Sequence, residues 1–285
     1  MSDGLGRTSS PAARLDLAGV VLAAGLGTRL RPLTDLRPKA LCPVNGVPLV
    51  DLALERVGEQ VLGRPGPTCG LATVDHLAVN AHHHARQVER HLAGRAHLSV
   101  EQPVPLGTAG ALGRLRPWLD GRAVLLTNAD AYLPGGLDDL VAGWDGERCR
   151  LLVTPLADGV RGDFERAAGP VRYVGACLLP WRFVRDLAEA PSGLYEVMWR
   201  QEDEAGRLDL ALTEATAIDC GTPADYLAAN LHASGGSSVV GEGATVEGTL
   251  DRCVVWDGAF VGPDEQLSRV VRAGSRQRPV TVDCR

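Results

Sequence analysis

Short, wholly apolar segments alternate along the chain with segments in which apolar residues recur at helical spacing. Residues 17–23 and 123–127 contain no polar alternation, which is typical of strands buried on both faces of a parallel sheet. Residues 48–62 show helical spacing with a proline near their start. Strands that alternate with helices of this length predict βαβ units. Right-handed crossovers fold such units into an open, doubly wound, Rossmann-like sheet with helices on both faces.

The same pattern predicts the other elements of the main domain, with residues 25–38 as a loop. Strands are expected at residues 76–80, 97–101, 149–155 and 171–180, with two short strands within 208–219. Helices are expected at residues 83–92, 108–119, 137–144, 183–188, 194–204 and 223–231.

The pattern changes after residue 231. Residues 234–238 (SGGSS) have the composition of a flexible hinge. Apolar pairs then recur about every six residues, which predicts rungs of a parallel β-helix that is too short to stand alone and packs on the main domain. The expected organisation is a disordered tail at 1–14, an α/β domain at 15–233, and a short left-handed β-helix-like segment at 234–285. An open end of that coil is a hypothetical site of homo-oligomer formation.

Composition narrows the class of protein. Apolar residues make up 45% and charged residues 22% of the 285, so the chain has enough apolar content for a globular core. The net charge of −6, without a basic stripe, argues against nucleic-acid binding. No apolar run approaches a membrane span, and the first residues lack a signal-peptide core. Seven scattered cysteines without a CxxC pair predict reduced thiols in a cytoplasmic protein.

The strongest candidate for chemistry is LAAGLGTRLRPLTDLRPK, residues 22–39, directly after a buried strand. Gly25 and Gly27 allow a ligand to approach the backbone, Thr28 donates a hydrogen bond, and Arg29 and Lys39 supply charge for phosphate oxygens. No GKS or GKT follows, so this is not a Walker loop, and the GxGxxG pattern is broken at its last position. A tight turn would explain the glycines alone; the whole set favours phosphate binding.

Three later segments place polar groups at the ends of predicted strands. EQPVPLGTAGAL (101–112) opens a helix whose free N–H groups suit a base or phosphate, although an ordinary helix start with a threonine cap is the better explanation of this segment taken alone. LLTNAD (125–130) and IDCGTPADY (218–226) each put an aspartate where α/β sheets bind their ligands. Either aspartate is also a common turn former.

LAAGLGTRLRPLT followed by RPKALCPVNGVPLVD resembles the signature of the sugar-1-phosphate nucleotidyltransferases, and the later segments match in order over roughly the whole chain. Members of that family join an NTP to a sugar 1-phosphate, giving an NDP-sugar such as GDP-mannose or a UDP-sugar, and release pyrophosphate. The resemblance implies the nucleotidyltransferase fold, which is a Rossmann-like α/β fold with a mixed sheet. It also implies dependence on Mg²⁺ and a place in cell-envelope or glycan precursor metabolism.

The resemblance also implies a role for individual residues. Arg29 and Lys39 would be catalytic, Asp130 and Asp219 would bind Mg²⁺, and Asn128 and Gly175 would contact the sugar. The implied nucleotide contacts are Leu22, Ala24, Gly25, Gly27, Thr28, Gln102, Gly107 and Thr108. The lysine that relatives carry before the strand at 171–180 is missing here, which leaves the sugar open.

Two alternatives remain at this stage. Besides a sugar-1-phosphate nucleotidyltransferase, the chain could be a nucleotidyltransferase of a non-sugar phosphorylated acceptor, such as phosphocholine. It could also be a non-catalytic regulatory subunit that binds an NDP-sugar. The run His82–His83–His84 is not expected to bind one metal ion, because consecutive side chains point in different directions. Trp181 and Trp199 are expected to be packing residues.

Overall fold

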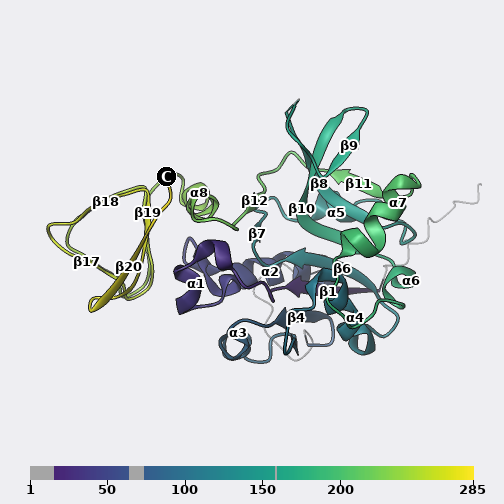
Figure 1. Ribbon diagram of the computed structural model, residues 1–285, viewed down its shortest axis with the longest axis horizontal. Helices are drawn as coiled ribbons and strands as arrows, with labels where there is room; N and C mark the ends of the chain where they lie inside the picture. Colours follow the sequence, from purple (N-terminus) through teal and green to yellow (C-terminus); the bar gives the residue numbers. More distant parts are fainter. Residues whose placement is uncertain (1–15, 64–73, 158) are drawn as a thin grey trace, which may run out of the picture.

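The computed structural model describes residues 16–63, 74–157 and 159–285, so the tail predicted at 1–14 lies outside the described residues. The centre of the fold is a mixed sheet with the strand order β11-β8-β10-β6-β1-β4-β5, and β9 pairs with β10 (Figure 1). Its strands are β1 (Leu17–Leu22), β4 (Leu77–Ala81), β5 (His97–Val100), β6 (Ala123–Asn128), β8 (Arg150–Pro155), β9 (Phe164–Arg166), β10 (Gly169–Leu179) and β11 (Asp209–Leu212).

Strand direction within this sheet sets where ligands bind. β1 is parallel to β4 and β6, and β4 is parallel to β5, as the apolar runs predicted. β10 is antiparallel to both β6 and β8, so the sheet is mixed. The carboxyl ends of β4, β1 and β6 therefore meet at one edge, where α/β sheets bind their ligands.

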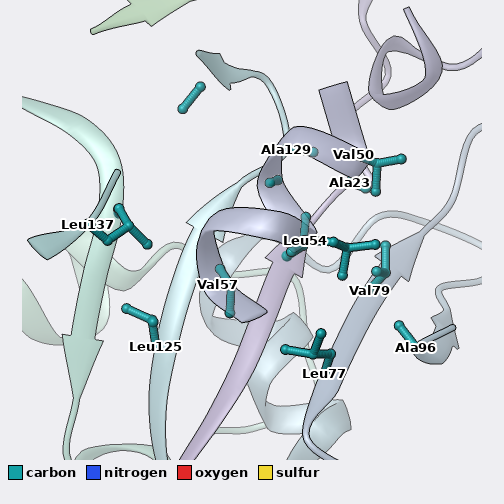
Figure 2. Packing of buried hydrophobic residues seen from close by; sticks show 14 of the residues in the cluster. Ala23, Val50, Leu54, Val57, Leu77, Val79, Ala96, Leu125, Ala129 and Leu137 are labelled. Atoms are coloured by element: carbon teal, nitrogen blue, oxygen red, sulfur yellow. The ribbon is translucent and has the colours of Figure 1, made fainter. Parts of the chain in front are cut away.

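Helices cover both faces of the sheet and close two apolar layers. One layer contains α2 (Leu49–Leu62), α3 (Ala85–Leu92) and α5 (Asp138–Val141). Figure 2 shows Leu54 and Val57 of α2 packed in this layer with Leu125 of β6. The other layer contains α4 (Gly107–Leu119), α6 (Trp181–Val184) and η4 (Tyr195–Trp199), a π-helical turn continued by α7 (Arg200–Glu204).

Several predicted elements need correction. The expected loop at 25–38 contains two helical turns, η1 (Thr28–Leu30) and α1 (Leu33–Leu36), and is followed by η2 (Lys39–Leu41) and the hairpin β2 (Pro43–Val44)–β3 (Val47–Pro48). Strand β9 was missed, and the helix expected at 137–144 is only the four residues of α5. The helix expected at 183–188 is wrong, because α6 ends at Val184 and the following backbone packs on the glycines of α4.

Beyond β12 (Ile218–Asp219), helix α8 (Pro223–Ala233) leads to the C-terminal strands, which lie at one end of the molecule (Figure 1). Strands β13, β16 and β19 pair in parallel, β20 adds an antiparallel strand, and β14–β17 and β15–β18 form two further parallel pairs. Their bounds are β13 (Val239–Val240), β14 (Thr245–Val246), β15 (Thr249–Asp251), β16 (Val254–Val255), β17 (Phe260–Val261), β18 (Gln266–Ser268), β19 (Val270–Ser275) and β20 (Arg278–Asp283). These are separate small sheets, so a β-helix stays a prediction.

The C-terminal segment packs on the main domain through Trp256, which is 2% exposed. Its indole N–H donates a hydrogen bond of 3.1 Å to the hydroxyl of Tyr226 in α8, and that hydroxyl donates to the carbonyl of Pro43. The guanidinium of Arg37 lies 4.4 Å above the Trp256 ring. The segment therefore contacts the residues before the η2 turn directly, through Arg37, and is linked through Tyr226 to Pro43 after the turn that carries Lys39. None of the helices in the described ranges is long and apolar enough to cross a membrane.

Candidate functional site

Three side chains end the parallel strands at the carboxyl edge of the sheet. Leu22 of β1 is in register with Asn80 of β4 on one side and Asn128 of β6 on the other. The chain then continues beside β1, because the N–H of Ala129 donates a hydrogen bond of 2.9 Å to the Leu22 carbonyl. The loop after β1 and the turn after β6 therefore lie together above the sheet.

Asp130 and Asp219, far apart in the sequence, converge at this edge. The short strand β7 (Ala131–Tyr132) pairs antiparallel with β12, which places Asp219 opposite Ala131, and the N–H of Cys220 donates to the Asp130 carbonyl at 3.0 Å. Lys39 lies between the two carboxylates. Its ammonium donates to Asp130 Oδ2 and lies 3.5 Å from Asp219 Oδ1.

The Lys39 side chain is 10% exposed, so its charge is stabilised mainly by these two partners. Arg29 is 65% exposed and lies 3.5 Å from the other oxygen of Asp219. Gly27 has φ +63°, and a Cβ there would lie 2.8 Å from Thr34 and 3.3 Å from the Lys39 side chain. The glycine therefore permits the turn that brings Arg29 and Lys39 to the same carboxylate.

Two cavities meet at this cluster. The smaller, of about 240 Å³, is lined by Leu22, Ala24, Gly25, Gly107, Thr108 and Asn80. The larger, of about 560 Å³, is lined by Asp219, Gly175, Thr154, Arg172, Tyr173 and Asp225. Asn128 and Asp130 line both. The arrangement suits a reaction between two ligands, one in each cavity, at the carboxylate pair.

The sequence matches known proteins over much of its length. The profile of the family described as "Nucleotidyl transferase" matches residues 18–154. The chain is 31% identical over 240 residues to N-acetylmuramate alpha-1-phosphate uridylyltransferase of Caulobacter vibrioides, which covers 74% of this chain and 94% of that protein. The chain belongs to the nucleotidyl transferase family. The predicted resemblance to the sugar-1-phosphate nucleotidyltransferases is thereby confirmed.

Further relatives of this nucleotidyl transferase agree. Glucose-1-phosphate thymidylyltransferase of Streptomyces antibioticus is 30% identical over 150 residues, which is 50% of this chain and 39% of that protein. A solved structure named as mannose-1-phosphate geranyltransferase from Thermus thermophilus matches with a TM-score of 0.63 and 19% identity over 95% of this chain and 96% of that one. At that identity the likeness shows the fold, including the mixed α/β nucleotidyltransferase sheet.

Most residues singled out in the sequence of this nucleotidyl transferase line one of the two cavities. Gln102 does not, and its side chain is exposed. Both linings also lack Gly27 and the two predicted catalytic residues, Arg29 and Lys39. Thr28 begins η1 and is absent from both linings. The hydroxyl of Thr108 already accepts a hydrogen bond of 2.8 Å from the N–H of Leu194, so it also anchors the chain before η4. The roles of all these residues stay predictions.

A buried hydrogen-bond network that sequence reasoning missed joins the loops around the smaller cavity. Glu101 is 0% exposed, and its carboxylate accepts from Asn80 Nδ2 at 2.7 Å and from the N–H of Leu106 at 2.6 Å. The side-chain oxygen of Asn80, Oδ1, in turn accepts from the N–H of Ala23 at 2.6 Å. The network holds the loop after β1 to the loop that precedes α4. The sequence signal for this network is a polar residue at the end of each of two predicted strands, Asn80 in 76–80 and Glu101 in 97–101.

A second group of side chains, which the sequence pattern did not predict, holds the turn that carries Asp130 in place. Arg56 of α2 is buried, and its guanidinium donates to the carbonyl of Ala131 at 2.9 Å and lies 3.4 Å from the hydroxyl of Thr127. Burial lowers the pKa of Arg56 to about 10. Thr127 also donates to the carbonyl of Gly175 at 3.2 Å. Arg56 and Thr127 thus fix the turn that carries Asp130 against β10.

Two of the three consecutive histidines have structural partners, and the cysteines that the structure describes are buried. His82 Nδ1 lies 2.9 Å from the Glu101 carbonyl oxygen, and His83 Nε2 lies 3.1 Å from that of Thr34. Within the described ranges, no three His, Cys, Asp or Glu side chains are grouped to hold a metal ion. The six cysteines in those ranges are free and buried, whereas Cys69 lies outside them. Burial raises the pKa of the Cys42 and Cys220 thiols to about 12.

Proposed function

We propose that this nucleotidyl transferase joins an NTP to a sugar 1-phosphate, giving an NDP-sugar and pyrophosphate. The observation that carries the proposal is the convergence of Asp130 and Asp219 on Lys39 where the two cavities meet. The smaller cavity, bounded by the glycine-rich loop and the start of α4, fits the nucleotide. The larger cavity fits the acceptor sugar and its phosphate.

Asp130 and Asp219 are proposed to hold Mg²⁺. Two carboxylates that already share one cation, the Lys39 ammonium, have the hard oxygen donors and the spacing for this ion. Because Mg²⁺ keeps several waters and takes phosphate oxygens as ligands, two protein carboxylates are a sufficient set. Bound there, the ion would neutralise negative charge on the phosphates.

The residues then have distinct tasks. Arg29, which is exposed beside Asp219, binds the departing pyrophosphate, and Lys39 moves from its carboxylates to the reacting phosphates when substrates enter. The attacking oxygen belongs to the phosphate of the acceptor, which is already an anion at neutral pH, so no general base is needed. The N–H groups of the loop at Gly25 and Gly27 hold the triphosphate.

The C-terminal strands support a second, structural proposal. We infer that their three sets of parallel pairs are the first turns of a left-handed β-helix, closed by the antiparallel strand β20. An open end of this coil would support a homo-oligomer. Light scattering over a concentration series tests self-association, and a monomer mass at every concentration would contradict it.

Product identification by mass spectrometry tests the reaction. The assay begins with Mg²⁺, UTP and N-acetylmuramate 1-phosphate, the substrate pair in the name of the Caulobacter vibrioides relative. We expect an NDP-sugar from the native protein and from the control Asp139→Asn, which changes an exposed carboxylate of α5. Asp130→Asn and Asp219→Asn should abolish it.

The outcomes separate the alternatives. A protein that binds a nucleotide but makes no NDP-sugar from any NTP and sugar 1-phosphate would be a regulatory subunit. Product only with phosphocholine, or with another phosphorylated acceptor that is not a sugar, would identify the other class of enzyme. Full activity of Asp130→Asn would refute the assignment of the metal site.

A further inference from the structure

A third cavity, of about 530 Å³, adjoins the larger cavity that is proposed to bind the acceptor. It is lined by Arg161, Phe164, Arg172, Tyr173, Tyr195 and Trp199. Arg172 and Tyr173 also line the acceptor cavity, so the two spaces share one wall. The wall is part of β10, beside the projecting β9 strand in Figure 1. A sugar bound in the larger cavity would therefore lie beside the third cavity.

The lining of the third cavity carries positive charge. Arg161 and Arg172 are exposed, and neither has an ion-pair partner among the residues that the structure describes. Their neighbour Arg166, by contrast, is paired with Asp203. The acidic residue of the lining, Asp163, accepts a hydrogen bond of 2.9 Å from the N–H of Tyr173. Two unpaired guanidinium groups facing one space leave it positively charged.

Aromatic side chains form the rest of the lining. Tyr173 and Trp199 meet edge to face with ring centroids 5.0 Å apart, and Phe164 and Tyr195 lie 6.2 Å apart. Trp199 was predicted to be a packing residue, and it is 6% exposed, yet its indole nitrogen is buried without a hydrogen-bond partner in the described part of the chain. An apolar lining beside two cationic forks suits a small group with a carbon skeleton and an anionic end.

We propose that this third cavity binds a carboxylate on the acceptor, which makes the substrate an acidic sugar 1-phosphate; this inference rests on the proposed function. Guanidinium groups bind carboxylates with two parallel hydrogen bonds, and each such charged contact contributes more than a neutral one. The acceptor phosphate occupies the cavity at Asp130 and Asp219, and the carboxylate lies between Arg161 and Arg172.

A pair of acceptors that differ in the acid tests the proposal. N-acetylmuramate 1-phosphate carries a lactyl carboxylate, and N-acetylglucosamine 1-phosphate is the same sugar without it. We expect kcat/KM to favour the acidic acceptor by about 10- to 100-fold in the native protein. Arg161→Gln and Arg172→Gln should each lower that ratio about tenfold or more, and the matched control Arg166→Gln should keep it.

The results also separate this inference from the proposed reaction. Turnover of both acceptors with a ratio that neither substitution changes would overturn the carboxylate site, while the reaction itself would stand. Equal losses with both acceptors would assign Arg172 to the acceptor phosphate instead, and would overturn the inference equally. Absence of turnover with every acceptor and every NTP would refute the proposed function, and this inference with it.

Discussion

The substitution Glu101→Gln tests whether the buried network positions the nucleotide loops. The Glu101 carboxylate accepts two hydrogen bonds, one from Asn80 and one from the N–H of Leu106. A glutamine has one acceptor oxygen, so one of these two donors loses its partner. Asn80 cannot rotate its amide to compensate, because its own oxygen accepts from the N–H of Ala23.

The magnitude follows from burial. Leaving one buried donor unsatisfied costs about 1–3 kcal/mol, and the lost bond is to a charged acceptor, so we expect a loss of about 2 kcal/mol. The midpoint temperature of thermal unfolding, Tm, should then fall by about 4–8 °C. Because the loosened loops must be ordered by the nucleotide itself, KM for the NTP should rise about tenfold, while KM for the sugar 1-phosphate stays within about twofold.

A compensating double variant makes the test specific. In Asn80→Asp with Glu101→Gln, the new amide at 101 donates to the new carboxylate at 80, which still accepts from the N–H of Ala23. Every donor then regains an acceptor, so the double variant should recover most of the lost stability in chemical denaturation. Two results would show that Glu101 does not hold the nucleotide loops in this way. One is a double variant whose loss in unfolding free energy is the sum of the two single losses, and the other is an unchanged KM for the NTP in Glu101→Gln.

Four other substitutions give independent predictions. Arg29→Ala should lower kcat about 100-fold while Tm stays within about 2 °C, since this side chain is 65% exposed; a normal kcat would remove its role. Gly175→Ala should destabilise the fold by about 1–3 kcal/mol in denaturant, because φ is +89° and the new Cβ would lie 2.9 Å from that of Ala131. Trp256→Ala should lower the free energy of unfolding by about 3–5 kcal/mol, measured by denaturation, and a neutral result would show that the C-terminal segment adds little. Burial raises the pKa of the Cys42 thiol from 9.0 to about 12. The contribution of the neutral thiol to the free energy of unfolding is therefore complete below pH 9 and is lost as the pH rises towards 12. Between these pH values, the free energy of unfolding should fall less steeply with pH in Cys42→Ala than in the native protein, by up to about 1.4 kcal/mol per pH unit.

The parts of the fold that sequence predicts well are those fixed by local patterns. The buried strands around β1 and the helix α2 follow from apolar runs and helical spacing. Asp130 was found because an aspartate at the end of a buried strand has a known position in α/β sheets. The glycine-rich loop was found because its residue types suit phosphate.

The contacts that depend on tertiary structure were not predictable in this way. The convergence of Asp130 and Asp219 depends on pairing of the two-residue strands β7 and β12, which are too short to show a pattern. Glu101 stands in a segment that was singled out, but its task follows from the adjacency of β4 and β5. An arginine in a helix is usually solvated, so the sequence gives no sign that Arg56 is buried beneath the Asp130 turn.

The most direct test of the proposed function is the release of pyrophosphate by the purified protein in the presence of Mg²⁺. The four NTPs are combined with a panel of neutral and acidic sugar 1-phosphates, and each compound is also assayed alone. The proposed function predicts release only when one particular NTP and one sugar 1-phosphate are both present. No release from any pair, by a protein that still binds a nucleotide, would contradict it.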